Sequence, residues 1–227
     1  MKIRFNREYL PMLADFMAVK DVRFFLNGFH VKPHPDCGVI ITATDGHRLV
    51  TIHDKDGQSD GEYILPISKP LLAAAKKTNV DGLPLNSVQF IDNKAFVLCW
   101  SDDNEFDFFE NDDESPMTQV LYVEYIAEID GRFPNTARIF KDFELKPIDH
   151  VGVNVEYIGK LKSVCTTKKF PMLNLMLSGS DGKIIAVSGY NNEIVSVVMP
   201  ARIDEIELVV PDFVKFGGGQ PKDKAEA

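Results

Sequence analysis

Three copies of one supersecondary unit follow one another along the chain, and this repeat restricts the possible fold more than any other feature of the sequence. The copies begin at FNREYL, ISKPLL and VNVEYI, each an apolar strand end followed by a polar residue and a helix-like run. Asn6, Ser68 and Asn154 are residue types that cap helices at such positions. Recurrence of this kind indicates an internal repeat. The sequence therefore predicts an α+β fold built from β-α-β-β-β units.

The first unit contains the clearest turn in the chain, TATDGHRLV. Asp45-Gly46 stands there between two alternating apolar runs, which predicts a hairpin with strands at Val39–Thr42 and His47–His53. The preceding run DVRFFLNG predicts a further strand at Arg23–Phe29. The carboxylate of the turn can simply bond the backbone, and the polar residues of the turn can equally form a binding surface.

The remaining elements follow the order of the repeat. The first helix carries Leu10, Leu13 and Met17 at helical spacing. The other expected helices are Lys69–Thr78 and Val155–Val164, and the other expected strands are Lys2–Phe5, Glu62–Ile67, Ser87–Ile91, Lys94–Trp100, Val120–Ala127, His150–Val153, Leu173–Ser178, Lys183–Ser188, Ile194–Met199 and Glu205–Val210. The last residues, 217–227, have the composition of a disordered end.

The composition is that of an ordinary globular protein, with 44% hydrophobic and 26% charged residues in a chain of 227. No apolar run has the length of a membrane span and no basic, then apolar, leader follows Met1, so a cytoplasmic location is expected. Cys37, Cys99 and Cys165 lie far apart without a CxxC pair, which predicts buried thiols rather than disulfides or a zinc site. We expect no cofactor and no metal.

The acidic residues are unevenly placed along the chain. The net charge of −9 argues at first sight against a nucleic-acid partner, but eight acidic residues fall within residues 102–114 alone. They belong to the stretch SDDNEFDFFENDDESP at 101–116, which lacks the glycine and the ligand spacing of a calcium loop. We expect an inserted, solvated loop. The alternative is that its Phe106, Phe108 and Phe109 dock on this protein or on a partner.

Basic residues accompany each of the three expected helices. Lysines on one solvated helix are common, but three basic helices in an acidic protein are consistent with one surface around a polyanion. The candidate DNA-contacting residues are Arg7, Lys20, Lys69, Lys76, Lys77, Lys160, Lys162, Lys168 and Lys169.

Four segments of the chain resemble the family of the bacterial DNA polymerase III beta subunit, the sliding clamp. They are DVRFFLNG, TATDGHRLV, IDGRFPNTARI at Ile129–Ile139 and VVMPAR at Val197–Arg202, and the resemblance extends over residues 1–203. It implies a DNA clamp fold, in which pairs of units form domains, helices line a central hole around duplex DNA and sheets lie outside. It also implies a non-catalytic processivity factor for a DNA polymerase, without catalytic residues.

The resemblance further implies a pocket for short linear motifs of client proteins. An apolar groove with a proline, and with arginines and a histidine at its rim, suits such a peptide. The implied residues are Leu26, Thr44, Gly46, His47, Arg48, Leu49, Pro134, Arg138, Ile139, Asn154, Tyr157, Val197, Met199, Pro200, Ala201 and Arg202. Ala201 stands where the family often has a larger apolar residue, so that part of the pocket is expected to be wider.

The chain departs from the family in its domain content. Residues 1–140 resemble a complete middle domain, residues 141–212 resemble the second half of the third domain, and residues 213–227 form a tail. A half domain exposes a sheet edge and an apolar face, which the same half domain of a second chain can cover about a two-fold axis. We therefore expect a dimeric building block and a tetrameric ring of twelve units with two equivalent faces. Its expected partners are duplex DNA, a DNA polymerase, other client proteins and a clamp loader, and no membrane.

Two other functions are alternatives to the clamp. A chain that keeps the peptide pocket without encircling DNA would act as a decoy or adaptor for replication proteins. A hydrolase that uses Asp45 and His47 is disfavoured, because neither a nucleophile motif nor a glycine-rich phosphate loop accompanies them.

Overall fold

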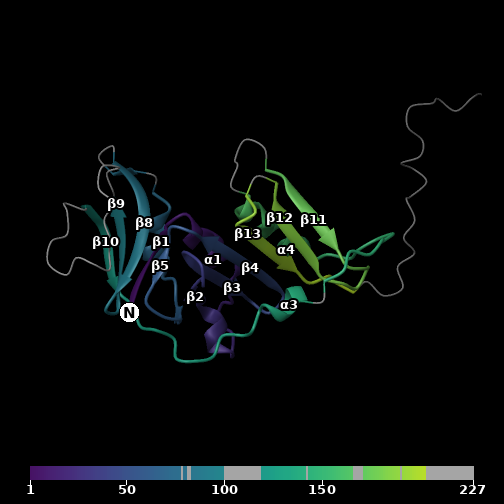
Figure 1. The fold of residues 1–227 in the computed structure, drawn as a ribbon, viewed down its shortest axis with the longest axis horizontal. Coiled ribbons are helices and arrows are strands. Elements are labelled where there is room, and N and C mark those ends of the chain that lie inside the picture. The colour runs from purple at the N-terminus through teal and green to yellow at the C-terminus, as the bar shows by residue number, and fades with distance from the viewer. Residues whose placement is uncertain are drawn as a thin grey trace, which may run out of the picture.

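The structure of the chain is a computed structural model, which describes residues 1–77, 79–80, 83–99, 119–141, 143–165, 171–189 and 191–202 (Figure 1). The acidic stretch, Lys168, Lys169, the strand expected at Glu205–Val210 and the tail lie outside these ranges. None of the helices in the described ranges is long and apolar enough to cross a membrane.

Two antiparallel sheets form the body of the protein. Their strands are β1 Lys2–Asn6, β2 Phe29–Pro33, β3 Val39–Thr44, β4 Arg48–Asp54, β5 Gln58–Ser59, β6 Tyr63–Leu65, β7 Asn79–Val80, β8 Leu83–Ile91, β9 Lys94–Cys99, β10 Gln119–Tyr125, β11 Leu173–Leu177, β12 Ile184–Ser188 and β13 Ile194–Val198. The six-stranded sheet has the order β10-β9-β8-β1-β5 with β7 beside β8, and the seven-stranded sheet has the order β11-β12-β13-β4-β3-β2-β6. The predicted α+β class is confirmed.

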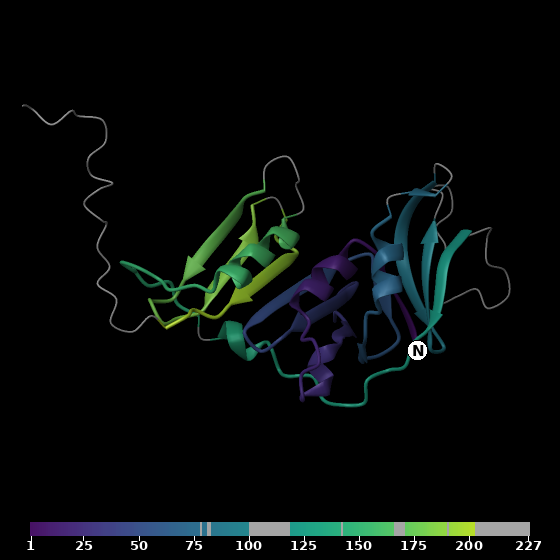
Figure 2. The same ribbon diagram turned by 180° about the vertical axis from the view of Figure 1, so that it is seen from behind.

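The helices at the starts of the three repeats lie on one side of the sheets (Figure 2). They are α1 (Tyr9–Phe16), α2 (Lys69–Ala75) and α4 (Val155–Lys160), and α4 continues directly into the 3-10 helix η2 (Leu161–Val164). A fourth short helix, α3 (Arg138–Lys141), follows the extended segment that runs along the rim of the molecule from β10 (Figure 1).

Two of the three predicted helix caps are confirmed. The side chains of Ser68 and Asn154 accept backbone N–H groups in the first turn of α2 and α4, at 3.0 and 2.9 Å. The cap predicted at Asn6 is wrong, because Asn6 ends β1 and its backbone N–H donates to Asp54 Oδ2 at 2.8 Å. Its side chain instead accepts the Glu8 N–H at 2.9 Å, in the turn that leads to α1.

The hairpin predicted at Asp45-Gly46 is confirmed, with β3 and β4 paired from Val39 and Asp54 up to the turn. Gly46 has a φ of 93°, a conformation that glycine adopts without strain.

The strand predicted at Arg23–Phe29 is wrong. A 3-10 helix, η1, occupies Phe24–Asn27, and β2 begins only at Phe29. The Leu26 carbonyl accepts the Ala18 N–H at 3.0 Å, which draws this segment back toward the end of α1 and buries the Leu26 side chain. The apolar run therefore reflects burial within a turn rather than strand pairing.

The larger apolar core lies between the helices and the sheets. Phe5, Phe29 and Phe90 pack together with ring centroids 5.7 to 5.9 Å apart. Leu161 and Val164 of the third repeat belong to the same core, and β13 pairs with β4. The first and third repeats therefore share one sheet, while the domain boundary expected near residue 140 stays a prediction.

Candidate peptide and DNA interfaces

The tight turn between β3 and β4 organises the candidate peptide site. The Asp45 carboxylate accepts the backbone N–H groups of His47 and Arg48 at 2.9 and 2.7 Å, so the turn is closed by its own side chain. Thr44 Oγ1 donates to the Arg48 carbonyl at 2.6 Å and accepts the Gly46 N–H at 3.1 Å. Thr44 and Asp45 thus act within the turn, as the simpler interpretation of the sequence has it.

Arg48 is enclosed between the first and third repeats. Its Nε and Nη2 donate to Asp45 Oδ2 at 2.9 and 2.7 Å, and its side chain is only 11% exposed. The guanidinium carbon lies 4.9 Å from the ring centroid of Tyr157 on α4 and 5.5 Å from that of Phe16 on α1. His47, which belongs to the same turn as Asp45, stacks its ring on that of Tyr157, with the ring centroids 5.8 Å apart. Arg48 therefore holds α1, α4 and the turn together.

The apolar candidates lie on the opposite face of the sheet, because neighbouring residues of a strand point to opposite faces. Leu49 pairs with Val197 across β4 and β13, and both are buried in a small cluster with Ile185. Ile139 of α3 packs against this cluster, and the Lys183 ammonium donates to the Ile139 carbonyl. The structure thus brings Leu49, Val197 and Ile139 together.

The segment after β13 places exposed side chains beside the turn. The Met199 N–H donates to the His47 carbonyl at 2.9 Å, while the Met199 side chain is 45% exposed. The Ala201 N–H donates to the Gly152 carbonyl at 2.9 Å, and Arg202 is exposed. Met199 and Arg202 therefore combine a fixed backbone with an accessible side chain.

The other candidates divide between buried and exposed positions. Leu26 of η1 is only 2% exposed, so its side chain lies in the interior. Pro134 and Arg138 are exposed, the first in the segment between β10 and α3 and the second on α3. Near the β3–β4 turn, the Arg23 guanidinium bonds the Asp21 carboxylate at 2.7 Å and lowers the pKa of Asp21 to about 2.

Replacement of Arg48 by alanine is expected to lower the free energy of unfolding by about 2 kcal/mol, since a charged hydrogen-bonded pair with Asp45 is lost where both are largely buried. Urea unfolding measures this change. Arg23→Ala is the matched control, because its ion pair with Asp21 is solvent-exposed and a smaller loss is expected. An equal loss in both variants would contradict the interpretation that Arg48 joins the repeats.

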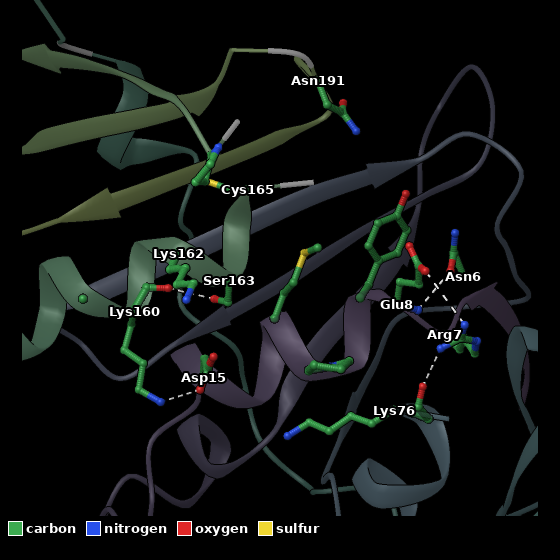
Figure 3. Close-up of a pocket in the computed structure, with 16 residues that line it drawn as sticks. Asn6, Arg7, Glu8, Asp15, Lys76, Lys160, Lys162, Ser163, Cys165 and Asn191 are labelled. Atoms are coloured by element: carbon green, nitrogen blue, oxygen red, sulfur yellow. Dashed lines mark hydrogen bonds and ion pairs between the residues drawn. The ribbon is translucent and has the colours of Figure 1, made fainter. Parts of the chain in front are cut away.

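A hollow of about 980 Å³ lies on the helix side, among α1, α2, α4 and η2 (Figure 3). Lys76, Lys160 and Lys162 stand on its wall together with Glu8 and Asp15. The Lys160 ammonium and the Asp15 carboxylate form an ion pair at 2.5 Å, which joins α4 to α1. This surface is positive at α2 and mixed between α1 and α4.

The candidate DNA contacts fall into two groups. Lys20, Lys69, Lys76, Lys77, Lys160 and Lys162 are exposed. Arg7 is buried, and its Nη1 donates to the Ala75 carbonyl at 2.7 Å. Arg7 thus packs α1 against α2. The expectation that Arg7 is exposed for a phosphate contact is wrong, because the side chain is buried.

Sequence reasoning missed Phe16 and Asp15 as parts of these sites. Phe16 continues the spacing of Leu10 and Leu13, and all three are fully buried, so the helical period was a signal for it. Asp15 and Lys160 are 145 positions apart in the sequence, so no local pattern predicts their contact.

The comparisons with known proteins point to one fold. No protein-family model and no curated protein matches the chain. Its structure is similar to those of the DnaN sliding clamps of Pseudomonas aeruginosa and Bartonella birtlesii, with TM-scores of 0.57 and 0.58 and 16% identity to each. It is also similar to a putative DNA polymerase III beta subunit of Eubacterium rectale, with a TM-score of 0.58 and 9% identity. Each alignment covers 89% of this chain and 66% of the other, so this chain spans about two thirds of the clamp chains' length.

The predicted fold class is confirmed by this likeness. Two antiparallel sheets with helices on one side match the arrangement of DNA clamp domains.

Proposed function

We propose that this protein is a DNA sliding clamp, a non-catalytic processivity factor that encircles duplex DNA as a homo-oligomeric ring and tethers replication proteins through a peptide pocket. The observation that carries the proposal is the common side of the three repeat helices, with exposed lysines on α2 and on the α4–η2 segment, in a clamp fold. The ring is proposed to be a tetramer of twelve repeat units, assembled from dimers.

The proposed DNA contacts are weak and independent of sequence. Exposed lysines approach phosphate oxygens as point charges and read no base edge. Asp15 holds Lys160 in the free protein, so a phosphate must compete with a carboxylate at that position. A closed ring tolerates such weak contacts, because it leaves duplex DNA only at an end or by opening.

The proposed peptide pocket uses the residues whose side chains remain accessible. Met199 and the edge of the Leu49, Val197 and Ile139 cluster offer apolar contacts. His47 and Arg202 face solvent, and Arg48 lines a hollow of about 480 Å³ with Tyr157 and Lys160, so we propose that the histidine and the two arginines meet the polar end of a client peptide.

Reversal of charge at Lys76 and Lys77 is expected to weaken binding to duplex DNA and to lower its salt dependence. Removal of two lysine–phosphate interactions should reduce the slope of log K against log salt by about 1.8. Fluorescence anisotropy with a short duplex at several salt concentrations measures the slope. Lys32→Glu with Lys94→Glu is the matched control, since both lysines are exposed on strands β2 and β9. If the control pair lowers the slope as much as the α2 pair, the helix side is not the DNA surface.

A non-encircling adaptor is the second candidate function, because the chain spans only about two thirds of the clamp chains' length. An adaptor would bind client peptides as a monomer or dimer, with no preference for circular over linear DNA.

A further inference from the structure

In the part of the chain that the structure describes, the two sheets end in edge strands of very different length. β5 and β7 comprise two residues each and β6 three, so they are too short to pair with another chain. β10 and β11, with seven and five residues, are long enough to do so. These two edges are therefore the candidates for pairing with a further strand.

β10 carries protective features. Its pairing with β9 is broken by a register shift between Val120 and Tyr122, and such bulges discourage edge-to-edge pairing. Its helix side is also occupied, because the Ser68 hydroxyl at the start of α2 donates to the Glu124 carboxylate, with its oxygen 2.7 and 2.8 Å from the two carboxylate oxygens.

β11 lacks these features. Its sequence, LNLML, contains no charge and no proline, and all five residues pair with β12 in regular register. The Met172 carbonyl accepts the Gly189 N–H on the β12 side, and the Leu177 carbonyl accepts the Lys146 N–H on the opposite side. Because main-chain groups alternate along a strand, Leu173 and Leu175 direct theirs to the open edge.

The side chains of β11 also extend an uncovered apolar surface on the helix side. Leu175 pairs with Ala186, which is fully buried, yet Leu175 itself is 49% exposed. Leu161 and Val164 of η2 share the core with Ala186, so the helical cover stops short of the edge strand. Met172, just before β11, is 55% exposed.

We propose that β11 pairs with β11 of a second copy of this chain, antiparallel about a two-fold axis. Two copies of an uncharged strand can pair antiparallel, because the outward N–H groups of one copy bond the outward carbonyls of the other. No like charges are brought together by this pairing. Pairing would place the leucine side chains of the two strands side by side and continue the apolar surface across the axis. This β11 contact rests on the proposed dimer. Sedimentation reports only the mass of the assembly, so a negative result there is distinguishable from failure of the peptide-binding and DNA-binding experiments.

The test compares single lysines on the two long edges. Leu175→Lys is expected to raise the dimer dissociation constant about tenfold, because each lysine would lie opposite the partner's Leu173 and the two added charges would stand close to the axis. Val123→Lys on β10 is the matched control, since Val123 is 50% exposed, and it should leave the dimer unchanged. Sedimentation velocity at micromolar concentrations measures both, with circular dichroism to check folding. Leu175→Ser, a milder change, should shift the equilibrium in the same direction.

Two results would overturn the proposal. One is dissociation caused by Val123→Lys but not by Leu175→Lys. The other is a monomeric wild type, and if that monomer becomes a dimer when the chain is ended at Arg202, the β11 surface belongs to the residues that follow.

Discussion

Circular plasmid DNA is expected to retain this protein through a high-salt wash, and a single double-strand cut in the plasmid is expected to release it. Phosphate contacts weaken by about 10³ between low and moderate salt, whereas a closed ring holds circular DNA whatever the salt. The expected difference between circular and linear plasmid is therefore of the same order, about 10³. Gel filtration of labelled protein with intact and cut plasmid measures it.

The plasmid experiment requires that the protein first be loaded onto the circular DNA. If the proposed ring assembles from dimers, dimers mixed with plasmid at low concentration and then concentrated are expected to close around the DNA without an additional protein. Native mass spectrometry of the same solution should show four chains for the proposed ring. Equal release from circular and linear plasmid by a protein that forms such rings would contradict encirclement, and a monomer or dimer that binds client peptide would favour the adaptor.

The elements predicted correctly from the sequence are those whose cause is local. Asp45-Gly46 closes its turn with bonds inside four residues, and Ser68 and Asn154 cap helices through N–H groups in the next turn. The DVRFFLNG segment was mistaken for a strand because its apolar residues are buried by contact with the end of α1, as the Ala18 to Leu26 hydrogen bond shows. Alternation and burial in a turn give similar patterns over so few residues.

The candidate site was predicted less completely, because its contacts join distant parts of the chain. The sequence offers Arg48 as a ligand-binding arginine but does not predict that Phe16 and Tyr157 pack against it from the first and third repeats. Arg7 looked like a surface cation, but it bonds the Ala75 carbonyl between α1 and α2. The residue type states what chemistry is available, and the packing decides whether a side chain can use it on a partner.

Met199→Ala is expected to weaken the binding of a client peptide about thirtyfold. An apolar anchor of this kind contributes about 2 kcal/mol or more when a peptide buries it. Met199 suits the test because its side chain is accessible while its backbone is held by the His47 carbonyl, so truncation should not disturb the strand. Leu26→Ala is a poorer probe, since Leu26 is buried and its loss would also destabilise the fold.

The measurement is fluorescence anisotropy with a labelled short peptide ending in an apolar and an aromatic residue. Val123→Ala is the matched control, because Val123 is similarly accessible, at 50% against 45% for Met199, but lies on β10 at the end of the other sheet. Its affinity should equal that of the wild type. His47→Ala and Arg202→Ala should weaken binding as well, since a peptide whose apolar end rests on Met199 places its polar end beside them. If Met199→Ala binds the peptide as tightly as Val123→Ala does, the pocket does not lie at this junction of β4, β13 and α4.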